Sequence, residues 1–184
     1  MRNSEDGMSM VELIVYMALS ALVLTILISF FLTGYRSQAA TRERDLATGS
    51  AQLISSSLTT GLRNADQAVA VGGNRLIART TTGSTGWQCQ EWKLATGDLS
   101  YRTRAASSSG SWSAWTSLRP SAGLTVVVTD SSGGSQPFNP VSTTLASGGR
   151  MQFGFTVKVG QTSVTVAGAE TLRAKGSETY TCPT

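Results

Sequence analysis

The stretch EDGMSMVELIVYMALSALVLTILISFFLTGYRS, residues 5–37, decides the fold of this chain because it contains a long apolar run. From Leu13 to Leu32 there are 20 consecutive residues without a charge, a Pro or a Gly. As one helix this run would be about 30 Å long, the thickness of the hydrocarbon core of a bilayer. A secretory signal peptide has a shorter apolar region, and a soluble core helix is rarely apolar on every face over such a length. The run therefore predicts a membrane-embedded segment.

The composition of the chain limits its chemistry. Its 184 residues allow one domain of ordinary size with an appendage, and its net charge of +4 is compatible with anionic partners without identifying one. There is no histidine, the commonest general base and metal ligand. The acidic residues past the helical region are scattered rather than gathered in a motif: Asp66, Glu91, Asp98, Asp130, Glu170 and Glu178. We expect no enzymatic activity, no bound metal and no cofactor.

The segment GMSMVE, residues 7–12, lies directly before the apolar run. It resembles the processing site of type IV prepilins and pseudopilins, in which a short polar leader ends in Gly and glutamate is the fifth mature residue. The resemblance implies that a membrane-embedded prepilin peptidase cleaves after Gly7 and methylates the new amino terminus at Met8. The chain departs from the family in having Met8 where Phe is more usual, and in a leader with little positive charge.

The same resemblance implies a topology and a set of partners. The amino end would lie in the cytoplasm and the remainder outside, with one span in the cytoplasmic membrane before the chain enters a cell-surface filament. The partners would be other pilin or pseudopilin subunits, the prepilin peptidase, a membrane assembly platform with a cytoplasmic ATPase, and membrane lipid before assembly.

Glu12 needs a physical reason to lie in this segment, because an ionised carboxylate in a spanning helix costs roughly 2.5–3.5 kcal/mol. In a staggered bundle, Glu12 of one subunit would face the Met8 amine of its neighbour. Two unit charges about 4 Å apart attract by about 4 kcal/mol at an effective dielectric of about 20, which offsets the cost. Glu12 is therefore predicted to set the register of assembly. The alternative is a glutamate that only reaches to the lipid headgroups.

Helical spacing continues past the membrane segment. The larger apolar residues form one stripe with polar residues elsewhere: Leu46, Leu53, Ile54, Leu58 and Leu62. This pattern predicts one long helix from about Met8 to Ala65. Near its end, LTTGLRNA (residues 58–65) is similar to the helix-to-sheet passage of the PilW-like and J-type minor pseudopilins. The expected organisation is a cleaved leader at 1–7, a transmembrane or filament-core helix at 8–35, its amphipathic continuation at 36–66 and an exported β-rich domain at 67–184.

After Asp66 the apolar period changes to two, which is typical of strands. Two hairpins are expected, Ala68–Val71 with Arg75–Thr80 and Trp87–Leu94 with Leu99–Ala105. Further strands are expected at Leu124–Thr129, Met151–Val159 and Thr162–Ala167, with loops between them. Trp87 and Trp92 would lie on opposite faces of their strand unless a bulge intervenes. The expected fold class is α+β, a helix-backed antiparallel sheet of about six strands that is type IV pilin-like.

Cys89 and Cys182 lie in the portion expected to be exported, where a disulfide between them would close a loop of roughly 90 residues and stabilise the fold. Two free thiols are the alternative. A Ser- and Gly-rich loop interleaves bases with indoles, a mixture that can hold nucleic-acid phosphates and stack on bases or sugars: Arg102, Arg104, Trp112, Trp115 and Arg119. The plainer interpretation is that the tryptophans anchor this loop to the sheet.

Two functions are open at this point. The first is a minor pilin or pseudopilin that helps to initiate or cap a filament used for DNA uptake, motility, adhesion or type II secretion. The second is a membrane-anchored adhesin or DNA receptor that does not polymerise. Glu12→Ala would separate them, because a simple anchor does not need a register.

Overall fold

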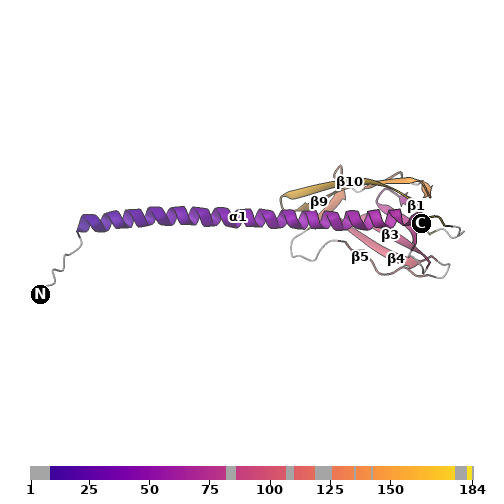
Figure 1. Cartoon of the computed structure of the whole chain (residues 1–184), viewed down its shortest axis with the longest axis horizontal. Helices are drawn as coiled ribbons and strands as arrows, with labels where there is room; N and C mark the ends of the chain where they lie inside the picture. The colour runs from indigo at the N-terminus through magenta and orange to yellow at the C-terminus, as the bar shows by residue number, and fades with distance from the viewer. Residues whose placement is uncertain are drawn as a thin grey trace. The chain divides into compact units, whose positions relative to one another are not determined.

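The computed structural model describes residues 9–81, 86–106, 110–118, 126–134, 136–141, 143–176 and 182–183. These divide into two compact units, one up to Arg42 and one from Glu43 onward. A single helix, α1 (Met10–Arg63), contributes to both units (Figure 1). The predicted long amino-terminal helix is therefore confirmed, together with the α+β fold class.

Helix α1 ends two residues earlier than predicted. Ala65 is the first residue of strand β1 (Ala65–Val71), where it pairs with Thr80 and its carbonyl accepts a hydrogen bond from the Ala174 amide at 3.1 Å. The amphipathic segment predicted at 36–66 thus ends at Arg63, and the β-rich part begins at Ala65 rather than at residue 67. Backbone bonds to distant strands decide this boundary, so the local helical period could not locate it.

The described strands form two antiparallel sheets, where the sequence predicted one sheet of about six strands. The larger sheet has the order β5-β4-β3-β2-β1-β8, and the smaller has the order β10-β9-β6 with β7 also paired to β9. The further bounds are β2 (Arg75–Thr81), β3 (Trp87–Ala95), β4 (Asp98–Ala105), β5 (Thr116–Ser117), β6 (Val126–Asp130), β7 (Phe138–Asn139), β8 (Thr144–Ala146), β9 (Arg150–Val159) and β10 (Thr162–Thr171).

Both predicted hairpins are present, as β1–β2 and β3–β4, and the predicted carboxyl-terminal pair of strands is β9–β10. The separate sheet arises because β9 and β10 pair along their whole length and β6 joins the far side of β9. The short strands β5, β7 and β8 lie in stretches predicted as loops. Strands of two or three residues contain too few positions to show a period of two.

The core lies between α1 and the sheets, where Leu58 and Leu62 of the helix are buried with Phe155 of β9 and Trp92 of β3. Trp92 donates a hydrogen bond from its indole nitrogen to Ser57 Oγ at 3.1 Å. A Cβ on Gly61 would overlap the Trp92 ring, so glycine allows this close approach. Because the β2–β3 register is continuous, no bulge intervenes, and Trp87 lies on the opposite face of the larger sheet from Trp92.

Strand β10 runs alongside the second half of α1 (Figure 1). The Gln161 amide at the start of the strand donates to Glu43 Oε2 at 3.1 Å, and Glu170 near its end pairs with Arg63 at 2.9 Å. A helix rises about 30 Å from Glu43 to Arg63, and a strand rises about 30 Å from Gln161 to Glu170. Because the two lengths match, one polar contact forms at each end of β10. These contacts hold the β9–β10 hairpin to the helix.

A turn after β6 is organised by the Asp130 carboxylate. This group accepts hydrogen bonds from the Ser132 hydroxyl at 2.6 Å and from the backbone amides of Ser132, Gly134 and Gln136 at 2.7–3.0 Å. These bonds, that of the Ser132 hydroxyl first among them, lower the pKa of Asp130 from 3.8 to about 2. The ionised carboxylate is therefore the form that stabilises the turn.

The contribution of this turn should be visible in the pH dependence of the free energy of unfolding. A carboxylate with a lowered pKa stabilises the fold above its ordinary pKa, and the stabilisation is lost as the pH falls from about 4 through about 2. We expect Asp130→Asn to cost about 1 kcal/mol near neutral pH and to flatten the acid limb of the curve. Denaturant titrations of both chains between these pH values measure the difference. A Ser132→Ala chain should show a smaller acid loss that ends at a higher pH than in wild type, because the folded pKa of Asp130 rises toward its ordinary value. An unchanged acid limb in both variants would contradict the assignment.

Candidate functional site

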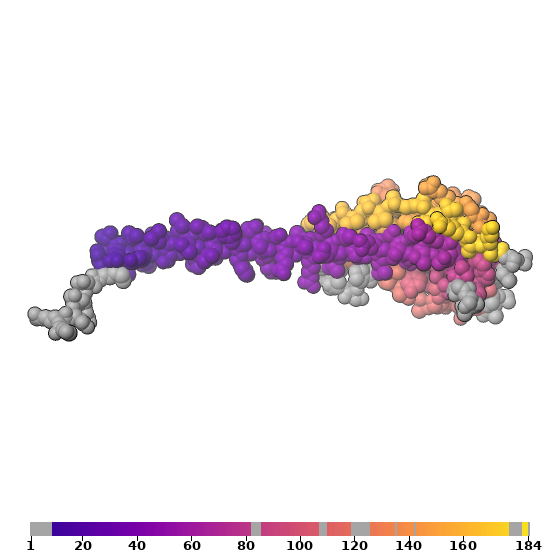
Figure 2. Space-filling model, in the orientation of Figure 1, coloured from indigo at the N-terminus to yellow at the C-terminus, as the bar shows by residue number. Residues whose placement is uncertain are grey.

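The first half of α1 presents an apolar surface to its surroundings. Its most apolar stretch is entirely unburied in the chain, with exposures such as 48% for Leu13 and 75% for Phe30. Figure 2 shows the side chains of this segment, coloured indigo to purple, projecting along the whole helix. By length and composition the helix can cross a membrane. An exposed apolar surface of this size marks a site of contact with a membrane or with another protein.

The hydroxyl groups within this apolar run are satisfied by the helix itself. Thr25, Ser29 and Thr33 each donate to the backbone carbonyl four residues earlier, at 2.8–2.9 Å. Hydroxyls bonded in this way are tolerated in an apolar medium because no donor is left unpaired. Glu12 therefore differs from these residues, because a carboxylate cannot be satisfied by donating to a carbonyl of its own helix.

Glu12 is exposed on the first turn of α1, where it accepts a hydrogen bond from the Tyr16 hydroxyl at 3.3 Å. Along the described part of the helix the next cationic residue is Arg36, which a helix places about 36 Å away. Gly7 and Met8, the predicted processing and methylation positions, lie outside the described residues. Within the described residues, therefore, no cation of the helix can reach the Glu12 carboxylate.

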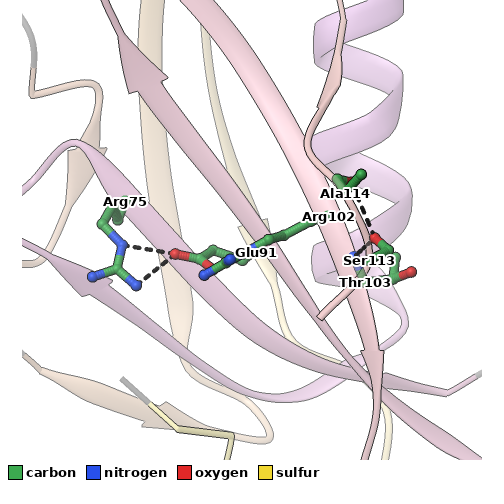
Figure 3. Close-up of polar contacts among 6 residues, drawn as sticks. All are labelled: Arg75, Glu91, Arg102, Thr103, Ser113 and Ala114. Atoms are coloured by element: carbon green, nitrogen blue, oxygen red, sulfur yellow. Dashed lines mark hydrogen bonds and ion pairs between the residues drawn. The ribbon is translucent and has the colours of Figure 1, made fainter. Parts of the chain in front are cut away.

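A second cluster of charges lies on the face of the larger sheet opposite Trp92, here called the outer face. Glu91 is fully buried there and lies between two arginines (Figure 3). Arg75 Nε donates to Glu91 Oε1 at 2.7 Å, and Arg102 Nε donates to Oε2 at 2.6 Å. Each oxygen of the carboxylate thus binds one guanidinium. One negative charge is shared by two positive charges, and the arginines are fixed in place.

The Arg102 guanidinium also contacts the loop that follows β4. It lies 4.6 Å from the centroid of the Trp112 ring and 4.3 Å from that of Trp115. Ser113, between these tryptophans, accepts a hydrogen bond at Oγ from the Thr103 amide at 3.0 Å and donates its own amide to the Thr103 carbonyl at 2.8 Å (Figure 3). The two tryptophans therefore pack this loop against the sheet through Arg102.

The structure brings most of the predicted loop residues together, and Glu91 was not among the predicted site residues. Arg104 and Trp112 line one cavity, which is described below, while Arg119 is outside the described residues. Glu91 comes from the neighbouring strand, where it pairs with Arg102 in the cross-strand register. The sequence signal that could have identified Glu91 is its spacing of two residues from Cys89 on β3, which places both side chains on one face of the sheet.

Cys89 and Cys182 form the predicted disulfide, with their Cα atoms 5.8 Å apart. The bond spans 93 positions of sequence, and closing a loop of that size contributes about 4.7 kcal/mol on the chain-entropy model. The strand position opposite Cys89 is Arg79, which pairs with the buried Asp66 and lies 5.1 Å from the Trp87 ring. This ion pair was not predicted, because a register shift in β1 next to Asp66 brings the two side chains together.

Two features of the described chain are thus unexplained by the folding of the chain alone. One is the exposed apolar helix with its single carboxylate, and the other is the cationic and aromatic outer face of the larger sheet. Comparisons with protein-family models, with curated proteins and with solved structures give no match for this chain.

Proposed function

We propose that this chain is a minor subunit of a type IV pilus-like filament, a pilin or pseudopilin that helps to initiate or cap assembly. It inserts into the cytoplasmic membrane through residues 8–35, is processed after Gly7 and then leaves the bilayer with its β-rich domain outside the cell. A long apolar helix followed by an antiparallel β domain supports this proposal, as does the resemblance of GMSMVE to a prepilin processing site.

The observation that carries the proposal is the position of Glu12. Its carboxylate lies on an apolar helix that no other described segment covers, and the nearest described cation on that helix is about 36 Å away. Burial without a partner would cost roughly 2.5–3.5 kcal/mol. An ammonium from a neighbouring subunit offsets this cost only in one stagger of the helices, so the pair specifies how subunits align.

A role in initiating or capping the filament is supported by the continuity of α1. No proline occurs between Met8 and Tyr35, and the helix is unbroken from Met10 to Arg63, whereas many filament-body pilins carry a helix-breaking residue in this region. The proposed partners are other pilin or pseudopilin subunits, the prepilin peptidase and a membrane assembly platform with its ATPase. Binding of DNA remains a prediction.

The intact mass of the protein recovered from its own cells tests this proposal. We expect a chain that begins at Met8, heavier by one methyl group at its amino terminus. Co-expression of the chain with and without a prepilin peptidase gives the matched control, since only the first should lose residues 1–7. A native chain that retains its first seven residues would contradict the proposal, because the amine would then not form beside Glu12.

A further inference from the structure

A cavity of about 410 Å³ opens on the outer face of the larger sheet, beside the arginine–tryptophan cluster. Its aromatic lining comes from Trp87 at the start of β3 and Trp112 in the loop after β4, which are far apart in sequence. The other lining residues are Gln88, Thr103, Arg104, Ala105, Ser111 and Ser113. Strand alternation places the Arg104 side chain on this face, whereas the side chains of Gln88 and Thr103 belong to the opposite face. The volume lies within the range of small-ligand sites in proteins.

The two indoles are fixed by the protein before any ligand arrives. Arg79 lies over the Trp87 ring at 5.1 Å, and Arg102 lies over the Trp112 ring at 4.6 Å. Both arginines are themselves held by carboxylates, Arg79 by Asp66 and Arg102 by Glu91. The cavity is therefore largely preformed, which lowers the entropic cost of binding.

The lining identifies the class of ligand. The Ser111 hydroxyl and the Arg104 guanidinium beside two indole rings match a sugar, which has hydroxyl groups around its edge and apolar C–H groups on its faces. Among the described residues that line the cavity, Arg104 is the one cation. A single guanidinium matches a single carboxylate, to which it can donate two parallel hydrogen bonds.

The arrangement is less suited to a nucleic-acid strand. Proteins hold such strands in a groove whose cations follow successive phosphates. Here the neighbouring cations Arg75 and Arg102 share the buried Glu91, and Arg79 is paired with Asp66. The positive charges of these three arginines are therefore already neutralised in part. They do not form a row of cations that could follow successive phosphates beside the cavity.

We propose that this cavity binds an acidic saccharide, a sugar unit with one carboxylate such as a hexuronate, with Arg104 on the carboxylate and Trp87 and Trp112 against the ring. This site is separate from the apolar helix, and its function does not depend on filament formation. It gives the exported domain a means of contacting an acidic polysaccharide or glycan.

Saturation-transfer NMR on the full-length chain in a sugar-free zwitterionic detergent tests the site. The probes are glucuronate, glucose and a short oligothymidylate. We expect glucuronate to bind with a dissociation constant on the order of 1 mM and glucose to bind more weakly. Arg104→Gln should weaken glucuronate binding by about ten-fold while reducing the preference over glucose. Ser111→Trp should block the cavity from an exposed loop position, and Lys158→Gln, which removes an exposed cation on β9 of the smaller sheet, should change binding by less than about two-fold.

Three results would overturn this proposal. The first is the absence of saturation transfer from the folded wild-type chain to glucuronate, and the second is binding of glucuronate to Arg104→Gln and Ser111→Trp as tight as to wild type. Binding of the oligothymidylate alone, with a steep dependence on salt, would instead assign the surface to nucleic acid. Near-ultraviolet circular dichroism reports whether each variant keeps its tertiary packing. Failure of the saccharide-binding test would not change the mass expected for the processed chain. The binding site and the filament-subunit function are therefore tested separately.

Discussion

Glu12→Ala is expected to reduce the number of assembled filaments at least about ten-fold while the chain still inserts into the membrane. In the proposed filament, the substitution removes an attraction of about 4 kcal/mol to a neighbouring amine together with a burial cost of roughly 2.5–3.5 kcal/mol. These two terms nearly cancel, so the net change in subunit affinity is small. The free-energy penalty on misaligned helices disappears, however, and the ordered growth of filaments should fail for that reason. Filaments sheared from cells and counted by electron microscopy, with membrane levels measured in parallel, give the result.

Two further variants isolate the charge of Glu12 from its local contacts. Glu12→Asp keeps the carboxylate and should retain part of the assembly. Tyr16→Phe removes the hydroxyl that donates to Glu12 at 3.3 Å but leaves the charge, so it should assemble close to wild type. Unchanged filament number in Glu12→Ala would reject the register role and favour a membrane anchor that does not polymerise.

Glu91→Ala is expected to lower the free energy of unfolding by about 3 kcal/mol. The substitution leaves the guanidiniums of Arg75 and Arg102 side by side without the carboxylate that both bind. Lys93 lies directly opposite Arg75 across β2 and β3, so a third positive charge adds to the repulsion. Denaturant titration of the full-length chain in detergent, followed by tryptophan fluorescence, measures the loss.

The matched control for Glu91 is Glu170→Gln, which breaks the ion pair with Arg63. The Arg63 side chain is 51% exposed, and water compensates a broken exposed pair far better than a buried one. This control should therefore change the unfolding free energy much less than Glu91→Ala does. Equal losses in the two variants would show that burial of Glu91 has no special importance. A Glu91→Gln chain should fall between them, because the amide keeps the volume and one acceptor.

The candidate site was predicted only where its residues lie close together in sequence. Arg102, Trp112 and Trp115 were grouped because they occur in and after one strand, and the structure places them in contact. Glu91 and Trp87 join the same face from β3. Their contribution depends on how β3 pairs with β4, and a shift of the register by one residue would turn both side chains to the other face.

The sequence alone determined the elements whose patterns are local. The apolar run and the amphipathic stripe that follows it specify α1, since each residue of a helix bonds to a near neighbour. Alternating segments joined by short turns specify the β1–β2 and β3–β4 hairpins for the same reason. The tertiary structure alone decided the division into two sheets, the burial of Glu91 between two arginines and the cavity between Trp87 and Trp112. These features join residues distant in sequence, and their geometry follows from strand register and packing, which local periodicity does not encode.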